Sequence, residues 1–160
     1  MQLETVRFGQ VDIDESKILV FGDGLPGLEE YSKFAIIKLD ESYPIVWLQS
    51  VEEMEICLPV IDSFVVLPDY SFDIGDEDVG ELELTNPEEL HVLSVLVVPE
   101  SIEGMTANLA APIVINKATN KAKQIILSGG EYNVRYPVFA NILKLIKEEG
   151  ADAGTVKEDK

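Results

Sequence analysis

The chain has 160 residues, 46% of them apolar and 26% charged, and thirty acidic against twelve basic residues give it a net charge of −18. This composition fits one globular domain and excludes a mostly disordered chain. The acidic balance disfavours nucleic acids and anionic membranes as direct partners, because Lys and Arg would be needed to neutralise their phosphates.

Cysteine content and hydropathy exclude further classes of protein. The single cysteine, Cys57, excludes an internal disulfide and a cysteine-rich zinc site. No apolar run approaches the roughly 20 residues that a membrane-spanning helix needs. The N-terminus lacks the basic-then-apolar pattern of a secretory signal, so we expect a cytoplasmic protein.

Short alternating or β-branched runs between turn formers predict strands along most of the chain. They are residues 4–8, 17–21, 34–39, 45–48, 55–61, 64–67, 81–84, 91–98, 113–116 and 122–127. The last two flank a polar hairpin loop in which Asn120 suits positive φ. No strand is followed by a long helical pattern before the C-terminus, which favours a mainly β, antiparallel sandwich or barrel with short helices.

Two segments are predicted to be helical. Residues 87–90 form one turn, with Asn86 as the N-cap and Pro87 at the first position. Residues 138–149 carry apolar side chains three and four positions apart, which predicts an amphipathic C-terminal helix that ends at Gly150. We therefore expect a single domain over residues 1–149 and a disordered tail over residues 150–160.

Charge is uneven along the chain. No Lys or Arg lies between Lys38 and Lys117, whereas 17 acidic residues do. Such a segment favours a basic protein partner, because complementary charge speeds encounter and suppresses wrong partners. Solubility alone would also explain the acidity.

Residues 22–27 match the glycine spacing of dinucleotide-binding loops but not its context. Pro26 lacks an N–H group, Asp23 places negative charge where phosphate would lie, and the next strand follows too soon for a crossover helix. The pattern instead predicts a tight turn in which Gly24, Gly27 or both have positive φ.

Residues that could support catalysis or metal binding are few. The acidic stretch 73–81 does not match the ligand spacing of a calcium loop, so a solvated acidic loop is predicted there, and no metal or cofactor is expected. His91 is the only histidine, no nucleophile elbow is present, and Cys57 resembles a small core residue. The alternative to a binding protein is a small ligand-binding or hydrolytic β-barrel centred on His91 or Arg135.

Residues 106–116 combine an apolar context with polar side chains. We expect the Asn108 side chain to bond local backbone groups, and Pro112, which cannot donate a strand hydrogen bond, to stand at a strand start. The segment either shapes a partner surface or is a structural turn.

Several segments stand in a specific order and spacing. They are Phe-Gly-Asp-Gly-Leu-Pro-Gly-Leu-Glu at 21–29, Trp-Leu-Gln-Ser at 47–50, Leu-Pro-Asp-Tyr at 67–70, Val-Val-Pro at 97–99, Met-Thr-Ala-Asn-Leu-Ala-Ala-Pro-Ile-Val-Ile-Asn at 105–116, Gln-Ile-Ile-Leu at 124–127, and Tyr132 with Arg-Tyr-Pro at 135–137. Together they resemble the flagellar assembly factor FliW family, from about Phe8 to Pro137. Leu28 departs mildly from the family pattern, where phenylalanine is frequent.

The resemblance implies a small, cytoplasmic, non-catalytic protein with a mainly antiparallel, β-barrel-like fold. It implies that the protein binds newly made flagellin and the regulator CsrA, an RNA-binding repressor of flagellin translation, and that the two compete for it. CsrA would then be inhibited directly, by covering its basic residues, or indirectly. The candidate partner-binding residues lie within the quoted segments: Gln49, Ser50, Asp69, Tyr70, Asn108 and Arg135.

Overall fold

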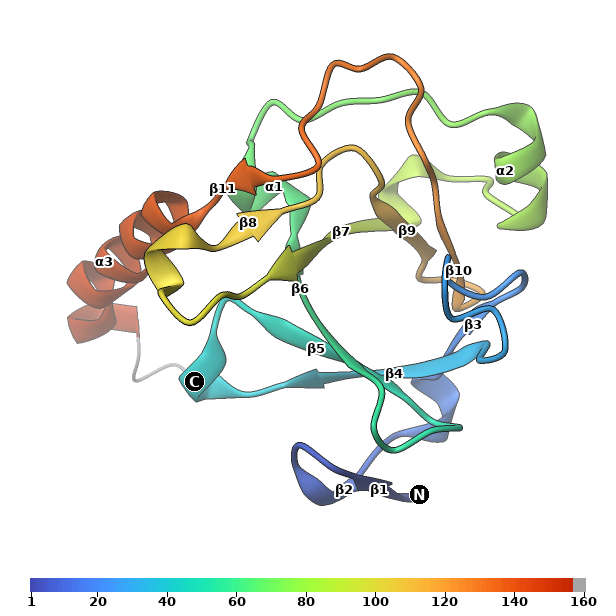
Figure 1. Ribbon diagram of the computed structural model, residues 1–160, viewed down its shortest axis with the longest axis horizontal. Coiled ribbons are helices and arrows are strands. Elements are labelled where there is room, and N and C mark those ends of the chain that lie inside the picture. Colours follow the sequence, from blue (N-terminus) through green and yellow to red (C-terminus); the bar gives the residue numbers. More distant parts are fainter. Residues whose placement is uncertain (157–160) are drawn as a thin grey trace.

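A computed structural model describes the backbone of residues 1–156 and the side chains of residues 1–148. Within these residues, seven strands close into a barrel (Figure 1): β3 (Leu19–Phe21), β4 (Lys33–Lys38), β5 (Val46–Ser50), β6 (Cys57–Asp62), β7 (Leu90–Val97), β9 (Ile113–Asn116) and β10 (Lys121–Gln124). The sheet order is β7-β6-β5-β4-β3-β10-β9, and pairing of β9 with β7 closes the ring. The mainly β, barrel-like prediction is confirmed, although β10 runs parallel to β3.

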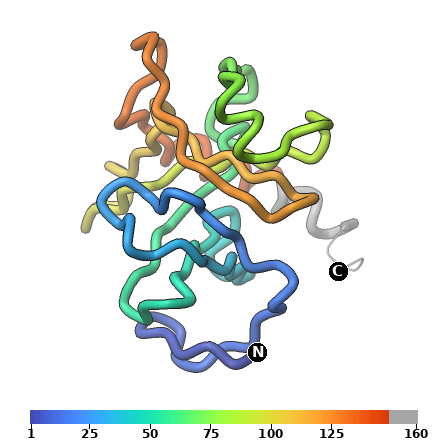
Figure 2. The backbone as a smooth tube through the Cα atoms, turned by 90° about the vertical axis from the view of Figure 1, so that its right-hand side faces the viewer, coloured from blue at the N-terminus to red at the C-terminus, as the bar shows by residue number. Residues whose placement is uncertain are grey.

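Shorter strands extend and cover the barrel. β8 (Thr106–Ala107) pairs with β7, and β11 (Tyr136–Pro137) pairs with β8. The hairpin of β1 (Gln2–Thr5) and β2 (Gly9–Asp12) packs on β5, where Phe8 meets Trp47 edge-on at 5.7 Å and the Arg7 guanidinium lies 4.6 Å from the same ring. Figure 2 shows this hairpin at the end of the molecule away from the loops that follow β6 and β10.

The helices lie outside the barrel. They are α1 (Ser63–Val66), α2 (Asp76–Glu81), α3 (Phe139–Val156) and the single turns η1 (Glu15–Lys17), η2 (Asp40–Ser42), η3 (Pro87–Glu89) and η4 (Ile102–Gly104). α3 packs against α1 and η4. Among the described residues, none of these helices has the length and apolar character needed to cross a bilayer.

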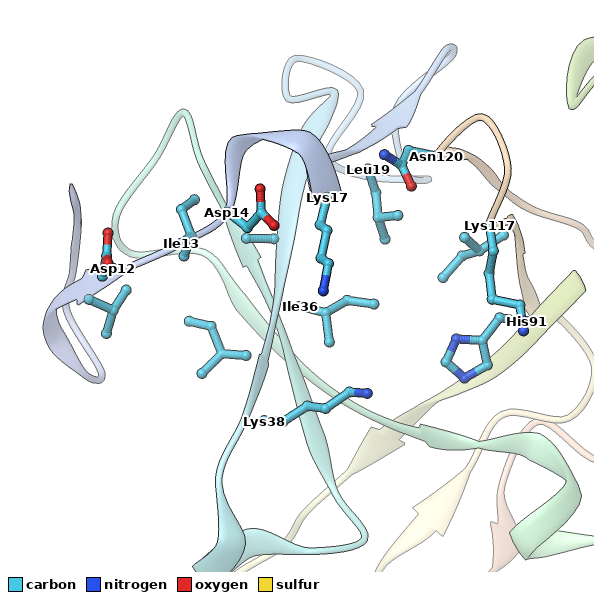
Figure 3. Close-up of a pocket in the computed structure, with 14 residues that line it drawn as sticks. Asp12, Ile13, Asp14, Lys17, Leu19, Ile36, Lys38, His91, Lys117 and Asn120 are labelled. Atoms are coloured by element: carbon cyan, nitrogen blue, oxygen red, sulfur yellow. The ribbon is translucent and has the colours of Figure 1, made fainter. Parts of the chain in front are cut away.

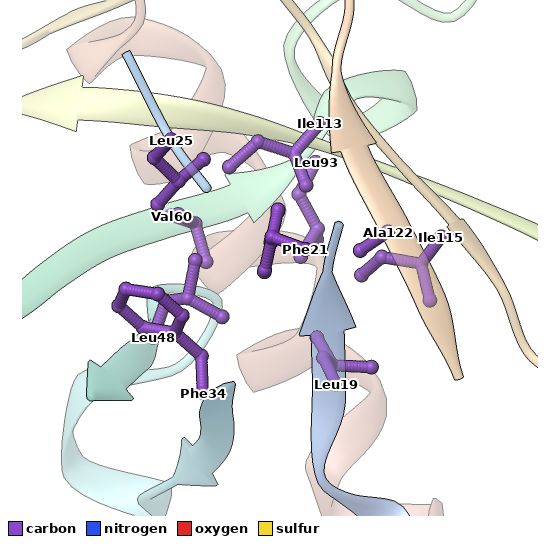
Figure 4. Close-up of a cluster of buried hydrophobic side chains, with 10 residues drawn as sticks. All are labelled: Leu19, Phe21, Leu25, Phe34, Leu48, Val60, Leu93, Ile113, Ile115 and Ala122. Atoms are coloured by element: carbon purple, nitrogen blue, oxygen red, sulfur yellow. The ribbon is translucent and has the colours of Figure 1, made fainter. Parts of the chain in front are cut away.

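Two large clusters of buried side chains form the core, and the alternation of side chains along β6 and β7 separates them. Inside the barrel lie Leu19, Phe21, Leu25, Phe34, Leu48, Val60, Leu93, Ile113, Ile115 and Ala122 (Figure 4). On the other face of the same strands, Ile61 and Val92 pack with side chains from α1 and α3, including Val66 and Ile142. Because both faces of these strands are buried, their sequences are almost continuously apolar.

The predicted strands at 64–67 and 81–84 are wrong. The Asp62 carboxylate accepts the Phe64 N–H at 2.9 Å and caps α1, so this β-branched run folds into one helical turn. Residues 81–84 instead finish α2 and turn at Glu83, which has φ of 54°.

Other elements also differ from prediction, and among the strands β3 begins at Leu19 instead of residue 17 and β10 ends at Gln124 instead of residue 127. The first strand, predicted at 4–8, is β1 and ends at Thr5. The acidic stretch 73–81 is not all loop, because α2 forms there with three acids in its first turn, where the helix dipole favours negative charge. α3 runs past Gly150 to Val156, so this glycine does not end the helix. Disorder of the tail stays a prediction, and residues 157–160 lie outside the described residues.

The predicted turn and cap residues are confirmed. Gly24 and Gly27 have φ of 72° and 84° in the turn between β3 and β4, and Asn120 has φ of 63°. The Asn86 side chain caps η3 by accepting the Glu88 N–H at 3.0 Å. Asn108 bonds local backbone as expected, and Pro112 directly precedes β9.

Candidate functional site

Gln49 and Ser50 of β5 are fully buried. Gln49 Nε2 donates to the carbonyls of Ser50 and Met54 at 3.1 and 3.3 Å, while its Oε1 has no hydrogen-bond partner among the described residues. Ser50 Oγ accepts the N–H groups of Glu52 and Glu53 at 3.1 and 2.9 Å. Both side chains therefore hold the β5–β6 turn in place and are not presented on the surface.

The other candidate residues lie on loops at one end of the barrel, at the top of Figure 1: Asp69 and Tyr70 after α1, Asn108 after β8, and Arg135 before β11. Asp69 and Arg135 are exposed, Asn108 is half-buried and Tyr70 is buried. The Tyr70 hydroxyl donates to the Leu109 carbonyl at 2.5 Å, and Leu109 N–H donates to the Asn133 carbonyl at 3.0 Å. These bonds join three loop segments, 69–73, 108–110 and 127–135, which we call the loop platform.

Tyr132 clamps the loop platform, a role that the sequence did not reveal. Its ring packs on Tyr70 with a centroid separation of 4.7 Å, and its hydroxyl donates to the Ser71 carbonyl at 2.7 Å while accepting the Ser71 N–H at 3.1 Å. Burial, with a smaller contribution from Tyr132, raises the pKa of the Tyr70 phenol. Tyr70 therefore stays neutral and acts as a structural donor.

A groove of about 370 Å³ crosses the loop platform. Its lining residues are Ser71, Phe72, Asp73, Leu127, Ser128, Gly129, Glu131 and Tyr132. Its charged side chains, Asp73 and Glu131, are both acidic, and Phe72 and Tyr132 supply aromatic walls. Such a lining suits a cationic side chain with an apolar stem, because Lys and Arg bury their stems on apolar surface and keep the charge outside.

The acid-rich segment between Lys38 and Lys117 does not form one surface. Its acids are divided among elements that lie on different sides of the molecule, such as η2 and α2 (Figure 1). Part of the charge is also neutralised, because Lys123 contacts Asp78 and Glu81 at 2.6 Å each and Lys121 pairs with Glu83. Asp73 and Glu131 on the loop platform have no such partner within the described residues.

The structure offers little to the alternative of a hydrolytic barrel. Within the described residues, no group of three His, Cys, Asp or Glu side chains is placed to hold a metal ion. His91 lines a separate groove that contains no Ser, Thr or Cys among its described lining residues, so no hydroxyl or thiol nucleophile lines the groove with it. Cys57 lies on β6 opposite Gln49, and burial raises the pKa of its thiol, which keeps it protonated.

Acidification is expected to destabilise the native protein more than a His91→Gln variant. Burial lowers the pKa of His91. The positive charges of Lys117 and Lys38 lower it further, and the negative charge of Asp62 opposes this effect. On acidification, His91 is therefore protonated in the unfolded chain before it is protonated in the folded one. The contribution of neutral His91 to stability is complete above pH ~6.5 and is lost as the pH falls below that value. Thermal unfolding at about pH 7.5 and 5.5 measures the difference, and equal losses in both proteins would contradict it.

Comparison with known proteins identifies the family. A model of the FliW protein family matches residues 2–138, which ends just before α3. The flagellar assembly factor FliW of Caldicellulosiruptor saccharolyticus is 40% identical over 135 residues, covering 84% of this chain and 88% of that protein. The corresponding protein of Ruminiclostridium cellulolyticum is 36% identical over 145 residues, covering 90% and 98%.

The fold agrees with this assignment. A crystal structure of the flagellar assembly factor FliW superposes with a TM-score of 0.81 at 31% identity, over 87% of this chain and 97% of that one. Sequence and fold thus match proteins of the same name over most of the chain, and the chain belongs to the FliW family.

Proposed function

We propose that the protein is a non-enzymatic, cytoplasmic flagellar assembly factor that binds flagellin and antagonises the translational regulator CsrA, so that repression of flagellin translation is relieved. The observation that carries this proposal is membership of the FliW family, whose relatives at 36–41% identity are named flagellar assembly factors. It requires no cofactor and no direct contact with nucleic acid or membrane.

The loop platform is the surface that best suits CsrA. A protein that grips RNA carries basic side chains, and the groove between Asp73 and Glu131 offers them two carboxylates and an aromatic wall. The exposed candidates Asp69 and Arg135 belong to the same loop platform. Contact here would either cover basic residues of CsrA or change its RNA-binding surface indirectly. A competition experiment with RNA distinguishes the two mechanisms, because direct covering predicts that RNA and this protein bind CsrA in a mutually exclusive way.

An apolar surface elsewhere suits flagellin. Val97, Val98 and Ile102 are 61%, 44% and 50% exposed, and α3, which packs against η4, adds Leu143 and Ile146 at 38% and 45%. Amphipathic helices of a newly made flagellin could place their apolar faces on this surface. Such contacts are apolar, so salt does not screen them.

The affinity for CsrA is expected to fall several-fold as salt rises from low to several-fold higher concentration, while the affinity for flagellin changes little. Exposed charges are screened beyond roughly 8–10 Å at physiological ionic strength, and apolar contacts are not. Titration calorimetry with each purified partner measures both affinities. Absence of binding to both partners would refute the proposed function.

Paired variants locate the CsrA surface. Asp73→Asn combined with Glu131→Gln should weaken CsrA binding and reduce its salt dependence, whereas Glu4→Gln on β1 is the matched control and should change neither. Unchanged CsrA affinity in the Asp73 and Glu131 variant would show that the loop platform is not the contact surface.

A further inference from the structure

A cluster of basic side chains lines the end of the barrel opposite the loop platform. It lies where β9 and β10 are joined, whereas the loop platform lies at the other ends of these strands. Lys17, Lys38, His91 and Lys117 each stand two residues beyond an apolar residue that packs in the barrel interior, respectively Leu19, Ile36, Leu93 and Ile115. Because side chains alternate along a strand, this spacing returns Lys38 of β4 and His91 of β7 to the interior side, and Lys17 and Lys117, just outside β3 and β9, line the same groove. We call this cluster the basic mouth.

The four side chains of the basic mouth line one groove of about 580 Å³. In Figure 3, Lys17 and Lys38 point into a shared space over Ile36, and Lys117 and His91 border it on the other side. The floor is apolar, formed by Leu19, Ile36 and Ile115 together with Ile13 at the rim. The volume falls within the range of about 300–1,000 Å³ typical of ligand sites, which often occupy barrel mouths.

The lysines of the basic mouth have no carboxylate partner. Within the described residues, no acidic side chain lies within 4.0 Å of the ammonium of Lys17, Lys38 or Lys117. The two acids in the lining are engaged elsewhere, since Asp12 pairs with the N-terminal ammonium at 3.3 Å and Asp14 accepts the Ser16 N–H and hydroxyl at 2.9 and 2.6 Å. Three unpaired lysines that face one groove, in a chain with thirty acids, favour an anionic occupant.

The barrel wall beside the basic mouth contains an unpaired strand edge. β4 pairs with β5 as far as Lys38, but β3 reaches only Lys33 and Phe34. The Val51 N–H donates to the Lys33 carbonyl at 2.9 Å. The backbone groups of every second residue from Lys33, namely Ala35 and Ile37, therefore also face β5. The backbone groups of Ile36 and Lys38 therefore face away from β5, toward the groove, where no described strand pairs with them.

We propose that the basic mouth binds an extended acidic peptide, which adds as a strand along the free edge of β4 and places its carboxylates among Lys17, Lys38 and Lys117. Peptides that extend a sheet gain affinity from backbone hydrogen bonds and specificity from alternate side chains. Here one set of alternate side chains, on the interior side, carries the carboxylates to the lysines, and the other set lies on the side of Ala35 and Ile37, which also line the groove. The free edge of β4 distinguishes a peptide from RNA and from a small anion, because neither of these can complete a β-ladder.

This site is separate from the surfaces proposed for CsrA and flagellin and does not depend on them. The test uses a fluorescein-labelled peptide of alternating glutamate and valine, titrated into the full chain and followed by fluorescence anisotropy. Combined Lys38→Glu and Lys117→Glu substitutions should weaken binding at least about tenfold, because attraction becomes repulsion. Lys144→Glu on the exposed face of α3 is the control and should leave the affinity unchanged. Lys38, Lys117 and Lys144 are all exposed, so folding is not expected to suffer.

Two further measurements separate strand addition from simple charge attraction. A peptide of the same charge with alternate backbone nitrogens methylated should bind more weakly, because it cannot complete the ladder with Ile36 and Lys38. In NMR, the pKa of His91, the only histidine, should rise on peptide binding as carboxylates offset the lysines around it.

Several results would overturn the proposal. They are failure of the peptide to bind, equal affinity of the charge-reversed variant, equal affinity of the methylated peptide, and tighter binding of inorganic phosphate or of an oligouridine RNA. Self-association of the chain that the Lys38 and Lys117 substitutions abolish would also overturn it, since a second copy would then be the occupant. The binding of CsrA and flagellin is measured independently, so failure here leaves the proposed function intact.

Discussion

Replacing Phe34 with alanine is expected to lower the free energy of unfolding by about 3–5 kcal/mol. The Phe34 side chain is fully buried in the barrel interior and meets Phe21 edge-on, with ring centroids 5.4 Å apart and an interplanar angle of 79°. Alanine would remove both the buried apolar area and this aromatic pair and leave a cavity that the closed sheet cannot collapse around. Because a domain is stable by only about 5–15 kcal/mol, the variant would be close to unfolding.

Urea denaturation followed by the fluorescence of Trp47, the only tryptophan, measures this loss. Ile126→Ala is the control, since Ile126 is 72% exposed and its truncation should change stability by less than about 0.5 kcal/mol. A cost for Phe34→Ala no larger than that of the control would mean that the barrel interior is not the main source of stability.

Gly24→Ala is expected to be much more destabilising than Gly27→Ala. Both glycines have positive φ, for which a side chain costs about 1–2 kcal/mol. A Cβ on Gly24 would also lie 2.6 Å from Glu29 Cα and 2.8 Å from the Glu29 carbonyl oxygen, whereas a Cβ on Gly27 would meet nothing within 4 Å. The neighbour at Gly24 is backbone, which cannot rotate away.

The Gly27 variant thus serves as the control for the backbone conformation, and the difference between the two variants reports the clash alone. We expect Gly24→Ala to cost at least about 2 kcal/mol more than Gly27→Ala in the same denaturation experiment. Similar losses of stability in the two variants would show that the backbone of Glu29 can shift away from residue 24. The close approach of these two residues would then not contribute to the cost of the substitution.

The sequence was sufficient to predict the barrel strands because burial of one or both faces leaves a direct mark in the pattern of apolar residues. The errors at 64–67 and 81–84 arise because a short apolar run does not distinguish a strand from a helical turn. A run such as Phe-Val-Val is equally apolar in a strand and in a single helical turn, and the choice depends on the Asp62 cap and on packing against α3. Likewise, Leu82 is buried beside Val114 of β9 without belonging to any strand.

The candidate site was less predictable, because the sequence does not show which polar residues are buried. Gln49 and Ser50 interrupt an apolar run, which fits either a binding residue or a buried structural one, and hydrogen bonds within the β5–β6 turn account for most of their polar groups. The basic mouth was missed because its lysines come from distant parts of the chain. Its only trace in the sequence is a basic residue two positions from an apolar residue near one end of a predicted strand.

The parallel pairing of β3 with β10 also constrains when the protein can fold during synthesis. Val20 pairs with Lys121, so the seam of the barrel joins residues from opposite ends of the domain. The interior therefore stays open to water until β10 has emerged from the ribosome, and apolar side chains such as Phe21 remain exposed for most of translation. Contacts between such distant residues also form slowly, which places barrel closure among the last steps of folding.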